Sequence, residues 1–159
     1  MRIVGVIGGS SVSKEIYNIA YNTGRLIGQR KYVLLTGGLS GVMEAASRGA
    51  KEEGGLVVGI LPGSSRDTAN RWVDIPIVTG MSHARNVIIA LTADILIAID
   101  GKVGTQSEIA FGNIYNKKII GIKCDISLPF EEVKTPEEAI ALVDQYFVKN
   151  NHKDTESTK

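Results

Sequence analysis

Glycine-rich segments that follow apolar runs are the parts of this sequence best suited to chemistry. The 159 residues include 18 glycines, above the usual share of about 7%. Most of the excess lies in three segments, residues 8–11, 37–41 and 101–105. Glycine after a strand lets backbone N–H groups approach an anion, and the N-terminus of a following helix adds partial positive charge. The pattern therefore predicts a phosphate-binding site.

We expect the phosphate contacts to come from these three segments. Neither G-x-G-x-x-G nor G-x-x-x-x-G-K-[ST] occurs, so an ordinary dinucleotide-binding protein or a P-loop NTPase is not predicted. For any one segment the alternative is that glycine only makes a tight turn, whereas three segments at one sheet edge favour a ligand. The expected phosphate-binding residues are Gly8, Gly9, Ser10, Gly37, Gly38, Gly41, Gly101, Lys102, Val103, Gly104 and Thr105.

Arg85 and Glu108 are the charged residues that we expect to act beside this phosphate. Cleavage of an N-glycosidic bond builds positive charge on the sugar, which the Glu108 carboxylate could stabilise while it orients or deprotonates water. Arg85 could hold the phosphate or the ribose hydroxyls. The alternative is an ordinary ion pair, or a first-turn glutamate that complements a helix dipole.

For five residues, the sequence is compatible with two interpretations each. Lys102 is either a solvated surface lysine or a charged donor to the phosphate. The Thr105 hydroxyl fits a helix N-cap as well as a phosphate contact. His83 is either a general acid or a structural or interface residue, and the second interpretation is favoured because no partner for it is visible in the sequence. Trp72 and Arg71 either cover the ring of a ligand or pack on the surface.

Apolar runs alternate with segments of helical spacing along most of the chain. Strands are predicted over residues 2–7, 32–36, 56–61, 75–78, 95–99 and 119–122. Helices are predicted over residues 13–29, 42–53, 83–92, 105–115 and 136–149, the last with Thr135 as its N-cap. Strands that are apolar on both faces predict a doubly wound, mostly parallel sheet with helices on both faces, a Rossmann-like α/β fold. Ligands of such sheets bind beyond the carboxyl ends of the strands, where the glycine segments lie.

Length and composition predict one nucleotide-binding domain over residues 1–149, with residues 150–159 as a flexible polar tail. The net charge of +1, without long charge blocks, and 6% aromatic residues argue against nucleic acid as a partner. The longest apolar stretch, residues 87–99, falls short of the roughly 20 residues of a membrane span. A lone cysteine and two distant histidines predict no disulfide, no metal site and a cytoplasmic protein.

Three segments resemble the successive motifs of the LOG-like, or SLOG, superfamily. They are residues 36–43 (TGGLSGVM), 81–86 (MSHARN) and 101–108 (GKVGTQSE), and the likeness covers roughly residues 2–122. That superfamily includes phosphoribohydrolases that release a base from nucleoside 5′-monophosphates, and it is marked by an arginine and a G-G-x-G-T-x-x-E segment. The resemblance implies a phosphorylated small molecule as the partner and a homo-oligomer. Members are often labelled lysine decarboxylase, although nothing in this sequence argues for decarboxylation.

Within the superfamily, Ala84-Arg85-Asn86 followed by Ala93-Asp94 is similar to the molybdenum-cofactor carrier protein branch, which is related to DNA-processing protein A. Phosphoribohydrolases usually have lysine in place of Asn86. The resemblance leaves two functions open: a hydrolase of nucleoside 5′-monophosphates with Arg85 and Glu108 as catalytic residues, or a non-enzymatic carrier or sensor. The bound ligand would be a nucleotide monophosphate, or the molybdenum cofactor or another phosphorylated pterin, and no further cofactor is expected to be required.

Overall fold

Strands and helices alternate through the computed structural model, which describes residues 1–156, with side chains through residue 151. The strands are β1 (Ile3–Gly8), β2 (Val33–Thr36), β3 (Val57–Leu61), β4 (Ile75–Val78), β5 (Ile95–Ile99), β6 (Lys118–Ile122) and β7 (Glu131–Val133). The α-helices are α1 (Lys14–Gln29), α2 (Val42–Glu52), α3 (Asn86–Thr92), α4 (Val103–Ile114) and α5 (Pro136–Glu156). Two 3-10 turns, η1 (Arg66–Thr68) and η2 (Ser82–Arg85), complete the described elements.

The seven strands form one parallel sheet in the order β4-β3-β2-β1-β5-β6-β7. From β1 the chain adds β2, β3 and β4 on one side of the sheet. It then returns to the other side of β1, where β5 pairs with β1 and Ile99 lies opposite Gly8. The order therefore reverses between β1 and β5, and the carboxyl ends of these two strands meet at that point. The predicted Rossmann-like, doubly wound fold is confirmed.

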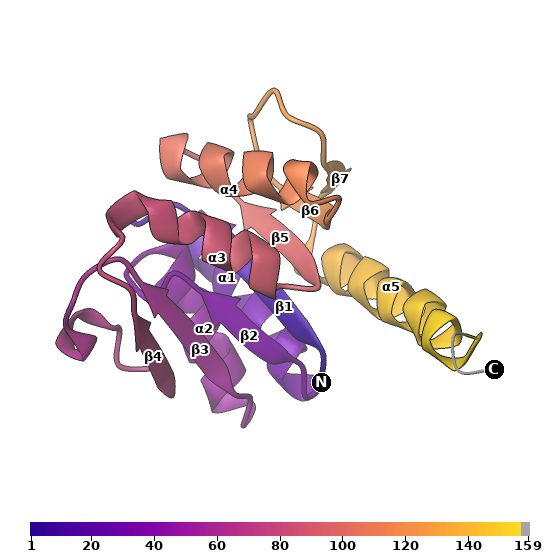
Figure 1. Ribbon diagram of the computed structural model, residues 1–159, viewed down its shortest axis with the longest axis horizontal. Helices are drawn as coiled ribbons and strands as arrows, with labels where there is room; N and C mark the ends of the chain where they lie inside the picture. The colour runs from indigo at the N-terminus through magenta and orange to yellow at the C-terminus, as the bar shows by residue number, and fades with distance from the viewer. Residues whose placement is uncertain (157–159) are drawn as a thin grey trace.

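Helices cover both faces of the sheet (Figure 1). Helices α1 and α2 pack together on one face and α1 also contacts α5, while α3 and α4 pack together on the other face. The central strand β5 supplies both layers, because Ile95, Ile97 and Ile99 face one core cluster while Leu96 and Ala98 face the other. Burial on both faces explains why the strands read as continuous apolar runs.

Local signals fix several helix boundaries. Ser13 caps α1 by accepting a hydrogen bond from the Ile16 amide at 3.2 Å. Thr135 accepts from the Glu138 amide at 3.2 Å, so the predicted N-cap of α5 is confirmed. Side-chain oxygens in these positions pair amides that the first helical turn leaves without a partner.

Several elements differ from the sequence predictions. The helix predicted over residues 83–92 begins only at Asn86, because residues 82–85 form the 3-10 turn η2. Strand β7 was not predicted because its residues, Glu-Glu-Val, carry no apolar pattern. Helix α4 begins at Val103, before its predicted start. Helix α5 continues through Glu156, into the segment 150–159 that is predicted as a flexible polar tail; residues 157–159 of that segment lie outside the described part. The polar segment contains no glycine or proline that would end a helix.

Candidate functional site

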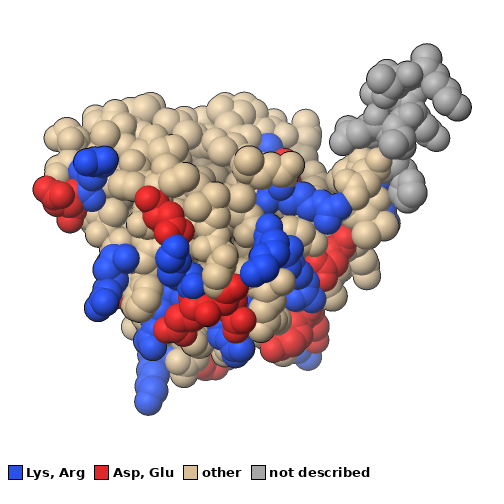
Figure 2. All heavy atoms as spheres, turned by 90° about the horizontal axis from the view of Figure 1, so that it is seen from below, with Lys and Arg blue, Asp and Glu red and all other residues tan. Residues whose placement is uncertain are grey.

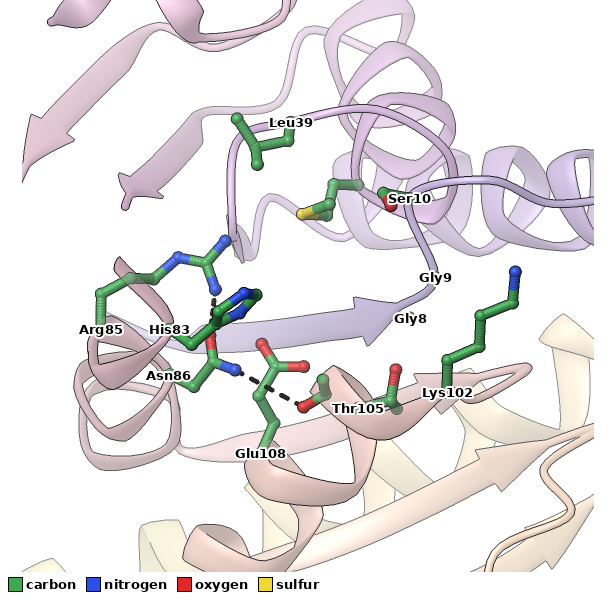
Figure 3. A pocket seen from close by; sticks show the side chains of 12 residues that line it. Gly8, Gly9, Ser10, Leu39, His83, Arg85, Asn86, Lys102, Thr105 and Glu108 are labelled. Carbon is green, nitrogen blue, oxygen red and sulfur yellow. Dashed lines mark hydrogen bonds between the residues drawn. The ribbon is translucent and has the colours of Figure 1, made fainter. Parts of the chain in front are cut away.

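A pocket of about 200 Å³ lies at the carboxyl ends of β1, β2 and β5, where the strand order reverses (Figure 3). This is the position at which open α/β sheets bind ligands. Four segments that are far apart in the sequence form its lining. The lining residues are Gly8, Gly9, Ser10, Leu39, Met43, His83, Arg85, Asn86, Lys102, Gly104, Thr105 and Glu108.

The pocket collects some of the residues expected from the sequence and leaves others outside. Both expected catalytic residues line it, together with six of the expected phosphate-binding residues: Gly8, Gly9, Ser10, Lys102, Gly104 and Thr105. The remaining expected residues, which are Gly37, Gly38, Gly41, Gly101 and Val103, are not part of the lining. Their surroundings point to structural roles.

Glycine in the β2–α2 loop makes room for neighbouring groups. A Cβ on Gly37 would lie 2.5 Å from Nη2 of Arg85 and 2.6 Å from Sδ of Met43. Gly41 has φ +67°, and a Cβ there would lie 2.3 Å from the Gly9 carbonyl oxygen. These distances are too short for a side chain, so glycine at position 37 leaves room for Arg85 and Met43, and glycine at position 41 lets the loop pack against the β1–α1 loop.

Hydrogen bonds hold the same two loops together. The Val42 amide donates to the Gly9 carbonyl at 3.0 Å, and the Ser40 hydroxyl donates to the Ser10 carbonyl at 2.8 Å. The loops therefore form one continuous wall of the pocket.

Backbone strain in the third loop lies at Asp100 instead of at Lys102. Asp100 has φ +56°, in the left-handed region that favours glycine, whereas Lys102 has an extended backbone with φ −123°. A Cβ on Gly101 would lie 2.5 Å from the Ile126 side chain, and Val103 is 81% exposed. Lysine at position 102 is therefore compatible with the loop, and its Nζ donates to the Ser11 carbonyl across the pocket mouth at 3.2 Å.

The N-terminus of α4 has donors that the rest of the described structure leaves unused. Lys102 is the N-cap position but gives no side-chain cap, so the first-turn amides have no intrahelical partner. Thr105 is 2% exposed, and its hydroxyl has no hydrogen-bond partner among the described residues. A Cβ on Gly104 would meet no atom within 4 Å. An uncapped helix N-terminus beside a buried unpaired hydroxyl and open space is suited to an anion.

Thr105 is the third residue of α4, so the N-cap interpretation of its hydroxyl is wrong. The phosphate contact of this hydroxyl stays a prediction.

Arg85 is held in place by oxygen atoms from three parts of the chain. Its Nε donates to the Ile60 carbonyl at 2.7 Å, its Nη2 to the Gly37 carbonyl at 3.3 Å, and its Nη1 to Oδ1 of Asn86. The side chain is 7% exposed. Burial lowers the pKa of the guanidinium from its ordinary value, and the nearby Glu108 opposes this shift. The fixed guanidinium gives the pocket a positive wall.

Glu108 lies at the base of the pocket with its carboxyl group directed into it (Figure 3). The side chain is 6% exposed, and it forms no ion pair with Arg85 or any other described cation. Burial raises the pKa of the carboxyl group to about 8, although Arg85 acts in the opposite direction. The group is therefore mostly protonated at neutral pH and can donate a hydrogen bond.

Asn86 is the most informative residue whose role the sequence analysis missed. It accepts from Arg85 through Oδ1 and donates through Nδ2 to the Ser107 hydroxyl at 2.9 Å. Ser107 in turn donates to the Gly104 carbonyl at 2.7 Å. Asn86 thus connects the arginine to the first turn of α4. The signal in the sequence was the position of Asn86 next to Arg85. Its second partner, Ser107, lies 21 positions later, and spacing along the chain could not predict that contact.

His83 also lines the pocket, although the sequence favoured a structural or interface role for it. The side chain is exposed at the pocket mouth.

The described residues include no group of three or more His, Cys, Asp or Glu side chains arranged to hold a metal ion. Each described helix is also too short or too polar to span a membrane.

The parallel sheet, its reversal between β1 and β5, and the pocket at that point define a Rossmann-like α/β protein. The chain belongs to the SLOG cluster4 family, whose model matches residues 1–151. The resemblance noted from the sequence motifs is thereby confirmed.

Relatives of known sequence extend this result. An uncharacterized protein of Archaeoglobus fulgidus is 47% identical over 138 residues, which are 86% of this chain and 91% of that protein. The cytokinin riboside 5′-monophosphate phosphoribohydrolase LOG5 of Arabidopsis thaliana is 31% identical over 113 residues. These residues are 68% of this chain but only 49% of LOG5.

Solved structures of molybdenum cofactor proteins are similar over nearly their full length. The molybdenum cofactor binding protein of Rippkaea orientalis has a TM-score of 0.87 and 36% identity, and the match covers 92% of this chain and 97% of that one. The molybdenum cofactor carrier protein of Chlamydomonas reinhardtii has a TM-score of 0.85 and 34% identity, with 92% and 98% covered. DNA processing protein A of Streptococcus pneumoniae, at 17% identity and a TM-score of 0.73, shares the fold, with 88% of this chain and 61% of that one covered.

Proposed function

We propose that this protein binds a phosphorylated small molecule, with the phosphate at the N-terminus of α4, and acts as a carrier or sensor. The observation that carries the proposal is the buried Thr105 hydroxyl without a partner among the described residues. A phosphate oxygen would satisfy this hydroxyl together with the first-turn amides. Arg85 and the Lys102 ammonium add positive charge on two sides of the pocket.

The molybdenum cofactor, a phosphorylated pterin, is the ligand that the relatives favour. Two structures that match nearly the whole chain are of proteins described as binding or carrying this cofactor. Here the cofactor would be cargo. Residues of this chain that fit its phosphate are Ser10, Lys102, Gly104 and Thr105, which all line the pocket.

The protonation state of Glu108 also favours binding over hydrolysis. A neutral carboxyl group cannot accept a proton from water, nor can it stabilise positive charge on a sugar as a carboxylate does. It can instead donate a hydrogen bond to an anionic ligand. With a pKa of about 8 this group suits anion binding at neutral pH.

Hydrolysis of nucleoside 5′-monophosphates is the second candidate function. It is favoured by the presence of Arg85 and Glu108 in one pocket and by the similarity to a phosphoribohydrolase. Under this hypothesis the release of base from AMP would increase as Glu108 ionises above pH 8. Glu108→Gln would abolish the release. If no base is released from AMP or GMP at pH 9, this second function fails.

Ligand binding is tested by native mass spectrometry of freshly isolated protein and by thermal denaturation. Any ligand that binds the native state raises the Tm, by an amount that grows with concentration. We expect a shift with AMP, GMP and the molybdenum cofactor, and a smaller one with inorganic phosphate. If none of these ligands at millimolar concentration changes the Tm, the proposed function is wrong.

We also propose that the protein is a homo-oligomer that associates through the face formed by α3 and α4, here called the α3–α4 face. Helix α3 has no charged residue, and the one charged residue of α4, Glu108, is buried. Exposed apolar side chains on this face are Leu91, Val103, Ile114 and Tyr115. Figure 2 shows the molecule from below, and on the side that it shows most charged side chains lie in the lower half while much of the upper half is uncharged. An uncharged apolar face of this kind is typical of an interface between identical subunits.

A further inference from the structure

A second hollow, here called the groove, adjoins the phosphate pocket. It has a volume of about 540 Å³ and is lined by Leu39, Ser40, Glu44, Thr68, Asn70 and Arg71. Leu39 also lines the phosphate pocket, so the two spaces are neighbours. Small-molecule sites usually have volumes of about 300–1,000 Å³. The phosphate pocket is smaller than this range, and a ligand with a ring system needs the groove as well.

Asn70 fixes the outer wall of the groove. Its amide donates to the Gly38 carbonyl at 2.8 Å, and its Nδ2 donates to the Leu39 carbonyl at 2.8 Å. Its Oδ1 accepts from the Trp72 amide at 3.1 Å. The segment 64–72 is therefore attached to the β2–α2 loop, and the groove exists before any ligand binds.

Arg71 gives the groove a planar cation. Its guanidinium lies over the Trp72 ring, 5.0 Å from the ring centroid, and Arg48 lies 5.8 Å from the same centroid. Trp72 thus contacts two guanidinium groups and does not line the groove. Arg71 does line the groove. A guanidinium can donate to a ring carbonyl oxygen or stack on a heterocycle.

Glu44 gives the groove a carboxylate. It lies in the first turn of α2, is partly exposed, and forms no hydrogen bond through its side chain and no ion pair among the described contacts. A carboxylate accepts two parallel hydrogen bonds from neighbouring N–H groups. A 2-amino-4-oxo pyrimidine ring, found in guanine and in pterins, presents an amino group beside a ring N–H. Adenine and hypoxanthine lack this pair of adjacent donors.

We propose that the groove is a ring subsite in which Glu44 accepts from the amino group and the ring N–H of a 2-amino-4-oxo pyrimidine. Arg71 faces the carbonyl oxygen or the ring plane of the same heterocycle. The proposal rests on the proposed function, because the phosphate of the same ligand occupies the pocket at α4. The site therefore selects guanine-type and pterin-type ligands over other phosphorylated rings.

GMP and IMP are a matched pair of probes, since they differ only in the 2-amino group. Isothermal titration at pH 7 should give a Kd for GMP about tenfold lower than that for IMP, because one good charge-assisted contact is lost. In Glu44→Gln the two Kd values should become nearly equal. Glu137→Gln, at an exposed first-turn glutamate of α5, is the matched control and should keep the preference.

The possible results separate this inference from the proposed function. Equal Kd values for GMP and IMP in the unchanged protein, or a preference that persists in Glu44→Gln, would overturn the ring subsite while phosphate binding stands. Such results are expected if Glu44 only complements the dipole of α2 and does not contact the ligand. If neither nucleotide binds at millimolar concentration, the proposed function and the ring subsite both fail.

Discussion

The guanidinium of Arg85 occupies the space that a side chain on Gly37 would need. A Cβ on Gly37 would lie 2.5 Å from Nη2 and 3.1 Å from Cζ of Arg85. The same Nη2 donates to the Gly37 carbonyl at 3.3 Å, across 48 positions of sequence. The residue after β2 therefore determines where the positive wall of the pocket lies.

Gly37→Ala should displace Arg85 and weaken phosphate binding. Overpacking at a buried position of this kind costs about 1–3 kcal/mol of unfolding free energy. We expect a loss in this range in urea denaturation, together with a higher Kd for AMP. Gly63→Ala is the control, since a Cβ there meets nothing within 4 Å, and its change should stay within about 0.5 kcal/mol. Equal stability and affinity for Gly37→Ala and the unchanged protein would contradict the role of Gly37.

Thr105→Val should reduce affinity without reducing stability. The hydroxyl has no internal partner among the described residues, so its replacement by a methyl group of similar size should leave the unfolding free energy unchanged or raise it by up to about 1 kcal/mol. The Kd for a phosphorylated ligand should rise about tenfold, because a donor to a charged group is lost.

The matched control for Thr105 is Thr23→Val. The Thr23 hydroxyl is also buried but donates to the Ile19 carbonyl at 2.8 Å, so this change should leave binding intact. Unaltered ligand affinity in Thr105→Val would show that its hydroxyl does not contact the phosphate.

Glu108 should make stability fall as pH rises from about 5 to 8. Its pKa is about 8 in the folded protein, whereas an ordinary glutamate has a pKa of 4.5. Between these values the folded state holds a proton that the unfolded state has lost, and unfolding free energy decreases by about 1.4 kcal/mol per pH unit from this group. The contribution is complete below the unfolded pKa and is lost as pH rises through the folded pKa. Urea denaturation at several pH values measures the slope, which should flatten in Glu108→Gln. If unfolding free energy falls with pH equally steeply in Glu108→Gln and in the unchanged protein, the pKa of Glu108 in the folded protein lies near 4.5 and is not raised.

Ile114→Lys should dissociate the oligomer. Ile114 is 66% exposed on the α3–α4 face, and a lysine there would carry its charge into a buried interface. Size-exclusion chromatography with light scattering should give a multiple of the 17.0 kDa chain mass for the unchanged protein and a smaller mass for the variant. Val148→Lys, at a position 58% exposed on α5, should keep the larger mass. A monomeric unchanged protein would refute this interface.

Much of the fold could be predicted because the central strands are buried on both faces, as β5 is throughout. Continuous apolar runs separated by glycine-rich turns leave few alternatives to a parallel α/β sheet. Strand β7 escaped prediction because its Glu-Glu-Val sequence pairs at an edge without burying a stripe of apolar residues. Helix α5 extends further than predicted because polar residues can continue a helix that contains no glycine or proline to end it.

The site could be predicted only in part because spacing along the chain does not separate ligand contacts from packing. Gly104 and Gly37 both follow strands, yet the first faces open space and the second faces Arg85. Asn86 and Ser107 meet only because the N-terminal ends of α3 and α4 converge on one pocket. The protonated state of Glu108 depends on burial, which no sequence motif records.

The most direct measurement is a crystal structure of the protein grown with a saturating concentration of GMP. We expect phosphate oxygens within hydrogen-bonding distance of the Thr105 hydroxyl and of the first-turn amides of α4. The Lys102 ammonium should turn from the Ser11 carbonyl toward the phosphate. If the phosphate binds elsewhere, or if the pocket holds no nucleotide at a saturating concentration of GMP, the proposed phosphate site at the N-terminus of α4 is wrong.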